Sequence, residues 1–293
     1  MKTPKVGVVI PIYYGRTYLR STLESVFRQT YAGPILVIGI EDGTPPDEAC
    51  RDICDAFPMQ YVAESQNRGV MACRRAGAEC LSEVDYLAFL DQDDIWHPHF
   101  LVEMVRQLED DPSLVFAVSN ARLTDQGQGQ RLYTDRIPSL CLDDLKVANQ
   151  IVSPSQVLMR MSRWQEVPWS GTLYGGADDW LLWLSMLSGG HSARYVPEVL
   201  LEYRVHAKGA HNDRDRMVHS ERKVVDEWFL RLGFSRWDQR RFYGRVAFDG
   251  LVEGLRDRQW GLVVQSLGQG IRDPWALWGA FRFRARHKAQ GLV

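Results

Sequence analysis

Short apolar runs that each end in a polar loop constrain the fold of this 293-residue chain most strongly. Residues 6–12, 35–40 and 86–90 are almost continuously apolar and too short for core helices, so we predict buried strands. Stretches with helical spacing of apolar residues lie between them, at 18–29, 47–57 and 69–81. Strands that alternate with helices predict a mostly parallel sheet covered on both faces by helices.

Later segments extend this pattern and then change it. We predict a short strand at 60–64, a helix at 99–108, a strand at 114–119 and an amphipathic helix at 178–188. From about residue 214 onward the chain reads as helical. The prediction is an α/β fold with two parts, a catalytic domain at 1–212 and a helical C-terminal extension at 213–293.

Composition excludes several classes of protein. A formal net charge of -2 and a pI near 6.4 give no basic field for nucleic acid, so no nucleic-acid partner is expected. Five cysteines without a Cys-x-x-Cys pair argue against a disulfide scaffold or a zinc ribbon, and predict reduced thiols in a cytoplasmic protein. The apolar run near the N-terminus reads as a first strand, and no run reaches the length of a membrane span.

Three carboxylates follow the strand at 86–90, in the sequence Leu90-Asp91-Gln92-Asp93-Asp94. Like charges clustered at the end of a buried strand cost free energy unless a cation, a proton or a ligand compensates them. The loops PIYYG and EDGT follow two other predicted strands. Ligands of open α/β sheets bind outside the carboxyl ends of the strands, so this edge is the candidate site.

Six short motifs resemble, in order, those of the family 2 glycosyltransferases over roughly residues 5–210. They are Val9-Ile10-Pro11-Ile12-Tyr13, Glu41-Asp42-Gly43, Asn67-Arg68-Gly69 with Arg74, Leu90 to Asp94, Asp178-Asp179-Trp180 and Tyr203-Arg204-Val205-His206. The resemblance implies the A-type glycosyltransferase fold, a nucleotide-binding α/β fold. Departures from the family pattern occur at Tyr14, Glu41, Thr44 and Arg75, where many relatives carry other residues.

The resemblance implies a divalent cation, Mn²⁺ or Mg²⁺, which suits oxygen-only ligands. Asp93 would coordinate it, Asp91 would contact the ribose or support the metal shell, and His206 would supply a third ligand or a diphosphate contact. The alternative for the acidic cluster is a solvated strand end in which Asp94 caps the next helix.

The resemblance also implies a donor site. Asp42 would accept a hydrogen bond from the imide N–H of uracil or thymine, which favours UDP-sugars or dTDP-sugars, and Pro11, Ile12 and Tyr13 would form the floor under the base. Arg74 would face the base or the phosphates. The other donor-site candidates are Asn67, Gln92 and Asp178. An ordinary turn aspartate at Asp42 and a solvated Arg74 remain the alternatives.

Asp179 matches the acid that takes the proton from the acceptor hydroxyl, which implies one in-line displacement with inversion. The alternative for Asp178 and Asp179 is favourable charge at a helix N-terminus. The expected acceptor is a glycan or a lipid-linked glycan in cell-surface polysaccharide synthesis, recognised by residues 120–175 and the C-terminal helices. A noncatalytic nucleotide-sugar-binding or assembly subunit is the other reading. A nucleotidyltransferase or a redox enzyme would need a glycine-rich loop after the first strand, and none is present.

The end of the chain interleaves aromatic and basic residues between 272 and 288. On a helix this pattern favours the interface of an anionic membrane, which would make the protein peripheral on the cytoplasmic membrane face. The same aromatic residues could instead pack on the catalytic domain. The sequence leaves both interpretations open.

Overall fold

A computed structural model describes five segments of the chain. They are residues 3–125, 129–133, 137–168, 176–205 and 214–289. The strands are β1 Val6–Ile12, β2 Ile35–Asp42, β3 Gln60–Glu64, β4 Tyr86–Phe89, β5 Ile95–Trp96, β6 Leu114–Asp125, β7 Val157–Arg160 and β8 Ser192–Val205. The helices of the first part are η1 Gly15–Thr17, α1 Leu19–Phe27, α2 Arg51–Cys54, α3 Val70–Cys80, α4 Phe100–Asp110, α5 Leu142–Leu145, η2 Pro154–Gln156, α6 Met161–Gln165 and α7 Asp178–Leu187. Those of the last part are α8 Arg214–Trp228, α9 Arg236–Arg256, α10 Trp260–Arg272 and α11 Pro274–Ala289.

The strands form one sheet in the order β3-β2-β1-β4-β7-β6-β8-β5. The first four are parallel to one another, as the alternation of strands and helices predicts. β7 then runs antiparallel to β4 and to β6, while β6 and β8 pair in parallel over most of their length. Half of the sheet is therefore parallel, and the half that begins at β7 is mixed.

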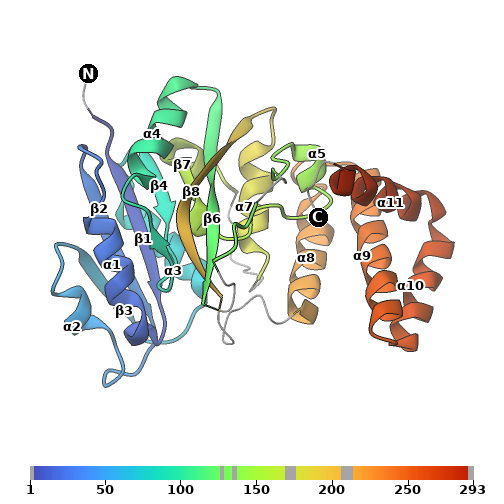
Figure 1. Cartoon of the computed structure of the whole chain (residues 1–293), viewed down its shortest axis with the longest axis horizontal. Coiled ribbons are helices and arrows are strands. Elements are labelled where there is room, and N and C mark those ends of the chain that lie inside the picture. The colour runs from blue at the N-terminus through green and yellow to red at the C-terminus, as the bar shows by residue number, and fades with distance from the viewer. Residues whose placement is uncertain (1–2, 126–128, 134–136, 169–175, 206–213, 290–293) are drawn as a thin grey trace.

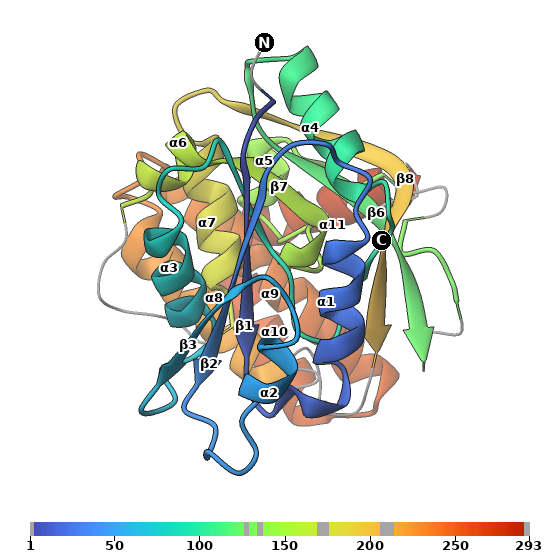
Figure 2. The same ribbon diagram turned by 90° about the vertical axis from the view of Figure 1, so that its left-hand side faces the viewer.

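The two faces of the sheet bury separate sets of residues because side chains alternate along each strand. On β1, Val6, Val8, Ile10 and Ile12 pack with α1, α2 and α4, whereas Val9 points to the face covered by α3 and α7. Figure 2 shows the sheet between these two helical layers. The result is a three-layer α/β arrangement.

One predicted helix is shorter than expected. The prediction of a helix at 47–57 is confirmed only for α2, Arg51–Cys54. The backbone N–H of Cys50 donates to Glu41 at 2.9 Å, and the carbonyl of Ala49 accepts from Arg16. These contacts to other elements hold the residues before α2 in a turn, so the helix starts late.

The prediction that α7 is amphipathic is wrong. Trp180, Leu182, Trp183, Leu184 and Met186 are all fully buried, so the helix has almost no solvent face. The sheet covers one side of α7, and helices α8 and α9 cover another side (Figure 1). The ring of Trp180 stacks on Phe242 of α9, with centroids 5.5 Å apart. The C-terminal helices therefore share a core with the helix that carries the two predicted site acids.

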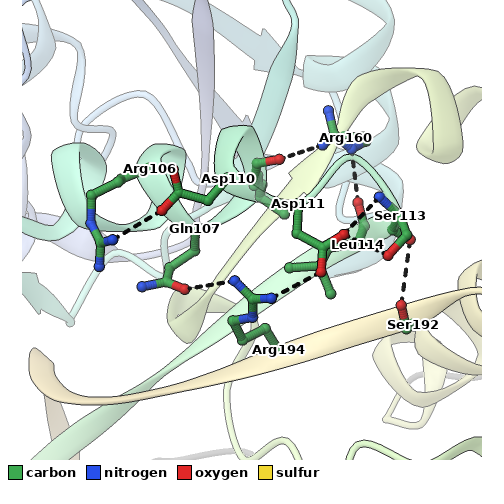
Figure 3. Close-up of polar contacts among 10 residues, drawn as sticks. Arg106, Gln107, Asp110, Asp111, Ser113, Leu114, Arg160, Ser192 and Arg194 are labelled. Atoms are coloured by element: carbon green, nitrogen blue, oxygen red, sulfur yellow. Dashed lines mark hydrogen bonds and ion pairs between the residues drawn. The ribbon is translucent and has the colours of Figure 1, made fainter.

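The end of the sheet opposite to the candidate site is held by two buried or half-buried arginines (Figure 3). Arg160 of β7 donates to the carbonyl oxygens of Leu108 and Leu114, which lie at the end of α4 and the start of β6. Arg194 of β8 pairs with Asp111 at 2.9 Å. These contacts join β7, β6 and β8 to α4 and fix the mixed half of the sheet.

Helix α9 begins with a capping box, in which Ser235 accepts from the N–H of Asp238 and the Asp238 carboxylate accepts from the N–H of Ser235. α10 and α11 both pack on α9. Over the described residues, no helix is long and apolar enough to cross a bilayer.

Candidate functional site

The carboxyl ends of β1, β2 and β4 lie at one edge of the sheet, since these strands are parallel neighbours. Tyr13 follows β1, Asp42 ends β2, and the acidic loop, defined here as Asp91 to Asp94, follows β4. The structure thus brings together three motifs that lie far apart in the sequence, at the edge predicted for a ligand.

Gln92 joins the acidic loop to the end of β1. Its side-chain amide accepts from the N–H of Tyr13 at 2.9 Å and donates to the carbonyl of Tyr13 at 2.8 Å. Gly15 makes room for this contact, because a Cβ there would lie 2.4 Å from Gln92 Oε1. Pro11 and Ile12 are buried within β1, while Tyr13 and Tyr14 expose their rings. Of the predicted floor residues, only Tyr13 is exposed to solvent.

Two of the departures from the family pattern lie in or beside the turn after β1. Tyr14, where many relatives carry asparagine, adopts a left-handed backbone with φ 49°, which asparagine tolerates better than tyrosine, so the structure does not explain this replacement. Thr44 keeps the hydroxyl group that matters here, since its Oγ1 accepts from the N–H of Tyr14 at 3.2 Å. Both residues hold the turn after β1.

Asp42 fixes the loop before α3. Its two carboxylate oxygens accept from the N–H groups of Arg68 and Gly69, at 2.7 and 2.9 Å. Gly43 has φ +70°, and a Cβ there would lie 2.4 Å from the N atom of Asn67, so this position requires glycine. Asn67 itself is exposed. Asp42 therefore has a structural role, whatever it binds in addition.

Arg74 of α3 is buried, with 5% of its surface exposed, which excludes the alternative of a solvated helix-surface arginine. Its guanidinium forms an ion pair with Asp91 and lies over the ring of Phe89, 5.7 Å from the centroid. Among the described residues its Nε has no hydrogen-bond partner. The buried guanidinium of Arg74 thus lies against the acidic loop, and its Nε–H has no hydrogen-bond acceptor among the described residues.

Asp94 is almost completely buried. The alternative in which it caps the next helix is wrong, because α4 begins after His99. Burial raises the pKa of Asp94 well above its usual value, and the nearby Asp91 and Asp93 carboxylates raise it further. Its carboxyl oxygens accept from Ser153 Oγ at 3.3 Å and from the N–H of Arg204 at 3.2 Å. Asp94 therefore joins the acidic loop to β8 and to the segment before β7.

Asp178 and Asp179 occupy the first turn of α7, as predicted. Burial raises the pKa of Asp179 to about 6; the charge of Arg74 opposes this rise, whereas Asp178 and Asp91 add to it. Asp179 Oδ1 accepts from the N–H of Trp180 at 2.7 Å, and Oδ2 accepts from Asn149 Nδ2 at 3.4 Å. A carboxyl group that titrates near neutral pH thus faces the Arg74–Asp91 pair.

Sequence reasoning missed the residues that connect these parts. Ser155 Oγ accepts from the N–H of Asp91 at 3.0 Å, and Asn149 contacts Asp179. Arg204 donates from Nε to the carbonyl of Asp93 at 3.0 Å, with its guanidinium over the ring of Tyr18. The capping box Ser153-Pro154-Ser155-Gln156 was a readable signal for a helical turn near Ser155. No sequence pattern marked Asn149.

Tyr203 of β8 lies close enough to four of the site acids for their charges to affect its pKa. Burial raises the pKa of its phenol, and four carboxylates raise it further, those of Asp94, Asp91, Asp93 and Asp179. The acidic loop and the first turn of α7 therefore face a common region.

The carboxylate oxygens at the site are ligands that fit a hard divalent cation. Within the described segments no three His, Cys, Asp or Glu side chains are gathered as a metal site, and His206 lies outside those segments. Mg²⁺-type ions, however, commonly use one or two protein carboxylates together with substrate phosphates and water. Asp91 and Asp93, close enough to perturb the pKa of Asp94, offer carboxylates of this kind.

Comparisons with known proteins agree with these motifs. Residues 7–162 match the family model described as glycosyl transferase family 2. The chain is 24% identical over 207 residues to the putative teichuronic acid biosynthesis glycosyltransferase TuaG of Bacillus subtilis, covering 69% of this chain and 79% of TuaG. Other curated relatives, 26% to 31% identical, are longer, and the chain spans 37% to 48% of their length.

Two solved structures share the fold. TarS residues 1–349 of S. aureus, in complex with UDP-GlcNAc, align with a TM-score of 0.61 at 12% identity, over 93% of this chain and 73% of that one. The mannosyltransferase PcManGT of Pyrobaculum calidifontis, in complex with GDP-Man and Mn²⁺, aligns with a TM-score of 0.58 at 17% identity, over 99% of this chain and 76% of that one. At such low identity these likenesses concern the fold, and they confirm the one predicted from the sequence.

Proposed function

The chain belongs to glycosyl transferase family 2, and on this premise we propose that it transfers a sugar from a nucleotide diphosphate sugar to an acceptor hydroxyl with inversion. The observation that carries the proposal is the position of Asp179, a partly buried carboxyl group whose pKa lies near 6 beside Arg74 and the acidic loop. A general base is most effective when its pKa lies near the working pH.

Asp179 is the proposed base. At neutral pH the Asp179 carboxyl group is ionised in most molecules. It can therefore take the proton of the acceptor hydroxyl while that oxygen attacks the anomeric carbon. Asn149 and the N–H of Trp180 hold the carboxylate in position. Asp178, buried in the same helical turn, is proposed to contact the donor.

Asp91 and Asp93 are the proposed ligands of the metal ion, together with His206. Bound Mn²⁺ or Mg²⁺ would neutralise charge on the diphosphate leaving group. Arg74 supplies a second positive charge on the same side, where it is paired with Asp91. Gln92 contributes by holding Tyr13 and the acidic loop together.

Asp42 is the proposed acceptor for an imide N–H of the base. Each carboxylate oxygen has two lone pairs, so the bonds to Arg68 and Gly69 leave acceptor capacity. This favours a uracil or thymine nucleotide, with the exposed Tyr13 and Asn67 lining the base site and Pro11 and Ile12 buried in β1 behind Tyr13. Guanine also carries a ring N–H, which is why a test must include GDP.

The acceptor is proposed to be a glycan or lipid-linked glycan of a cell-surface polymer, which the likeness to TuaG supports. As part of this proposal we keep the predicted division of the chain into two parts at residue 212. Residues 1–212 would bind the donor and carry the base, and residues 213–293 would serve acceptor or membrane contact.

Calorimetric titration tests the donor site. Wild-type protein is titrated with UDP, dTDP, GDP and CDP, in Mn²⁺ and in excess chelator, beside Asp93→Ala and the exposed control Asp110→Ala. We expect metal-dependent binding of UDP or dTDP that Asp93→Ala loses and Asp110→Ala keeps. Absence of binding to all four would refute the proposal, and binding without donor hydrolysis or transfer would favour the noncatalytic subunit.

A further inference from the structure

Helices α10 and α11 expose an apolar face. It consists of Trp260, Val264, Leu267, Ile271, Trp275, Trp278 and Phe281, all at least 43% exposed. On α10 its members recur at intervals of four, three and four residues, so they form one stripe along the helix. Ile271, Trp275 and Val264 are the most exposed among these, at 79%, 70% and 69%, followed by Trp260 at 67%. Large apolar side chains gathered in this way on a solvent-exposed surface mark an interaction site.

The packing on α9 fixes the direction of this face. Val263 and Ser266 of α10 are buried, as are Ala276 and Ala280 of α11. A Cβ at Gly244 of α9 would lie 2.3 Å from the carbonyl oxygen of Ala276, so the helices meet backbone to backbone. Small residues of both helices therefore lie against α9, Val263 and Phe283 are buried as well, and the seven residues of the apolar face stay exposed. α10 lies on the side of the molecule away from β1 to β3 (Figure 1).

Helices α10 and α11 contain basic residues and no acidic ones. The sequences of α10 and α11 contain no Asp or Glu, and their basic residues are Arg272, Arg282, Arg284, Arg286 and Lys288. The acid between the two helices, Asp273, is paired with Arg240 at 2.9 Å. The sequences of these two helices thus carry five Arg or Lys residues and no acidic one.

We propose that the apolar face docks on a bilayer surface that contains anionic lipid. Tryptophan is favoured at membrane interfaces, because its ring is apolar and its N–H is polar. Apolar burial combined with basic residues is the usual basis of binding to anionic membranes. Docking of two copies through this face would bring two sets of five positive charges together, which opposes self-association. The charge therefore selects the anionic bilayer as the occupant.

This proposal goes beyond the transfer reaction and does not depend on the donor site. Flotation tests it, with vesicles of phosphatidylcholine alone or of phosphatidylcholine mixed equally with phosphatidylglycerol. The test variant is Trp260→Gln/Ile271→Gln/Trp275→Gln. The control is Trp237→Gln/Leu230→Gln, which removes two exposed apolar side chains outside the face.

We expect the wild type to bind the anionic vesicles at least about tenfold more tightly than the neutral ones, and less tightly as salt is added. The triple variant should lose at least about tenfold in affinity for the anionic vesicles, while the control keeps it. Circular dichroism and the UDP titration verify that each variant is folded. A wild type without nucleotide binding would count against the transferase proposal alone.

Three results would overturn the membrane proposal. They are no binding of the wild type to anionic vesicles, equal binding of the wild type and the triple variant, and a wild-type dimer in analytical ultracentrifugation that the triple variant abolishes. The last result would assign the face to self-association.

Discussion

Replacement of Asp179 by asparagine should abolish transfer and yet stabilise the fold above pH 6. The folded protein prefers the protonated form of this carboxyl, because burial raises its pKa from 3.8 to about 6. The favourable contribution to stability is therefore complete below pH 3.8 and is lost as pH rises through about 6. Asparagine resembles the protonated acid at every pH, so it avoids this loss.

The structure gives the size of the effect. The rise from 3.8 to about 6 corresponds, at about 1.4 kcal/mol per pKa unit, to about 3 kcal/mol of unfolding free energy. Asparagine keeps an oxygen for the N–H of Trp180 but loses the acceptor for Asn149. That contact is long, at 3.4 Å, so its loss should reduce the gain in unfolding free energy by about 0.5 kcal/mol. The expected net gain is about 2.5 kcal/mol above pH 6 and near zero below pH 4.

Urea denaturation of ligand-free protein between pH 4 and pH 8 measures this difference. The control is Asp143→Asn, at an exposed carboxylate whose surface pair with Lys146 should contribute under about 1 kcal/mol at any pH. A stability difference for Asp179→Asn that does not change with pH, or a variant less stable than wild type at pH 8, would refute the reasoning. Transfer should fall by about a hundredfold or more in the same variant.

Three further substitutions test the site and its support. Arg74→Met should destabilise the fold by about 2–3 kcal/mol in urea, because it leaves the Asp91 carboxylate without its partner, and an unchanged midpoint would contradict this. Gly15→Ala should displace Gln92 and weaken UDP binding about fivefold or more by calorimetry, about 1 kcal/mol; equal affinity would show that the contact is unimportant. Phe242→Ala should cost about 3–5 kcal/mol of stability, which a smaller loss in thermal unfolding would disprove.

The parallel half of the sheet could be predicted because its strands are continuous apolar runs with polar ends. β1 and β3 have the predicted bounds, and the acidic loop follows β4 as expected. β7 and β8 were not predicted. β8 mixes exposed and buried residues without regular alternation and pairs with β6 across register shifts, so its burial arises from tertiary packing and not from a local pattern.

The site could be predicted only in part for a related reason. The acids stand in recognisable motifs, but the environment that gives each acid its properties comes from elsewhere in the chain. Burial of Arg74 depends on the fold of α3 against Phe89, and the contact of Asn149 with Asp179 depends on the loop before η2. Such pairings of single polar residues leave no periodic signal in a sequence.

The strand order also divides the site along the chain. Tyr13, Asp42 and the acidic loop precede residue 95, whereas Asp179, the proposed base, and Arg204 follow residue 176, and β7 returns the chain to β4 between them. The family match ends at residue 162, just after β7, before the base. A chimera joined at this junction would therefore take Tyr13, Asp42 and the acidic loop from one chain, and Asp179 and Arg204 from another.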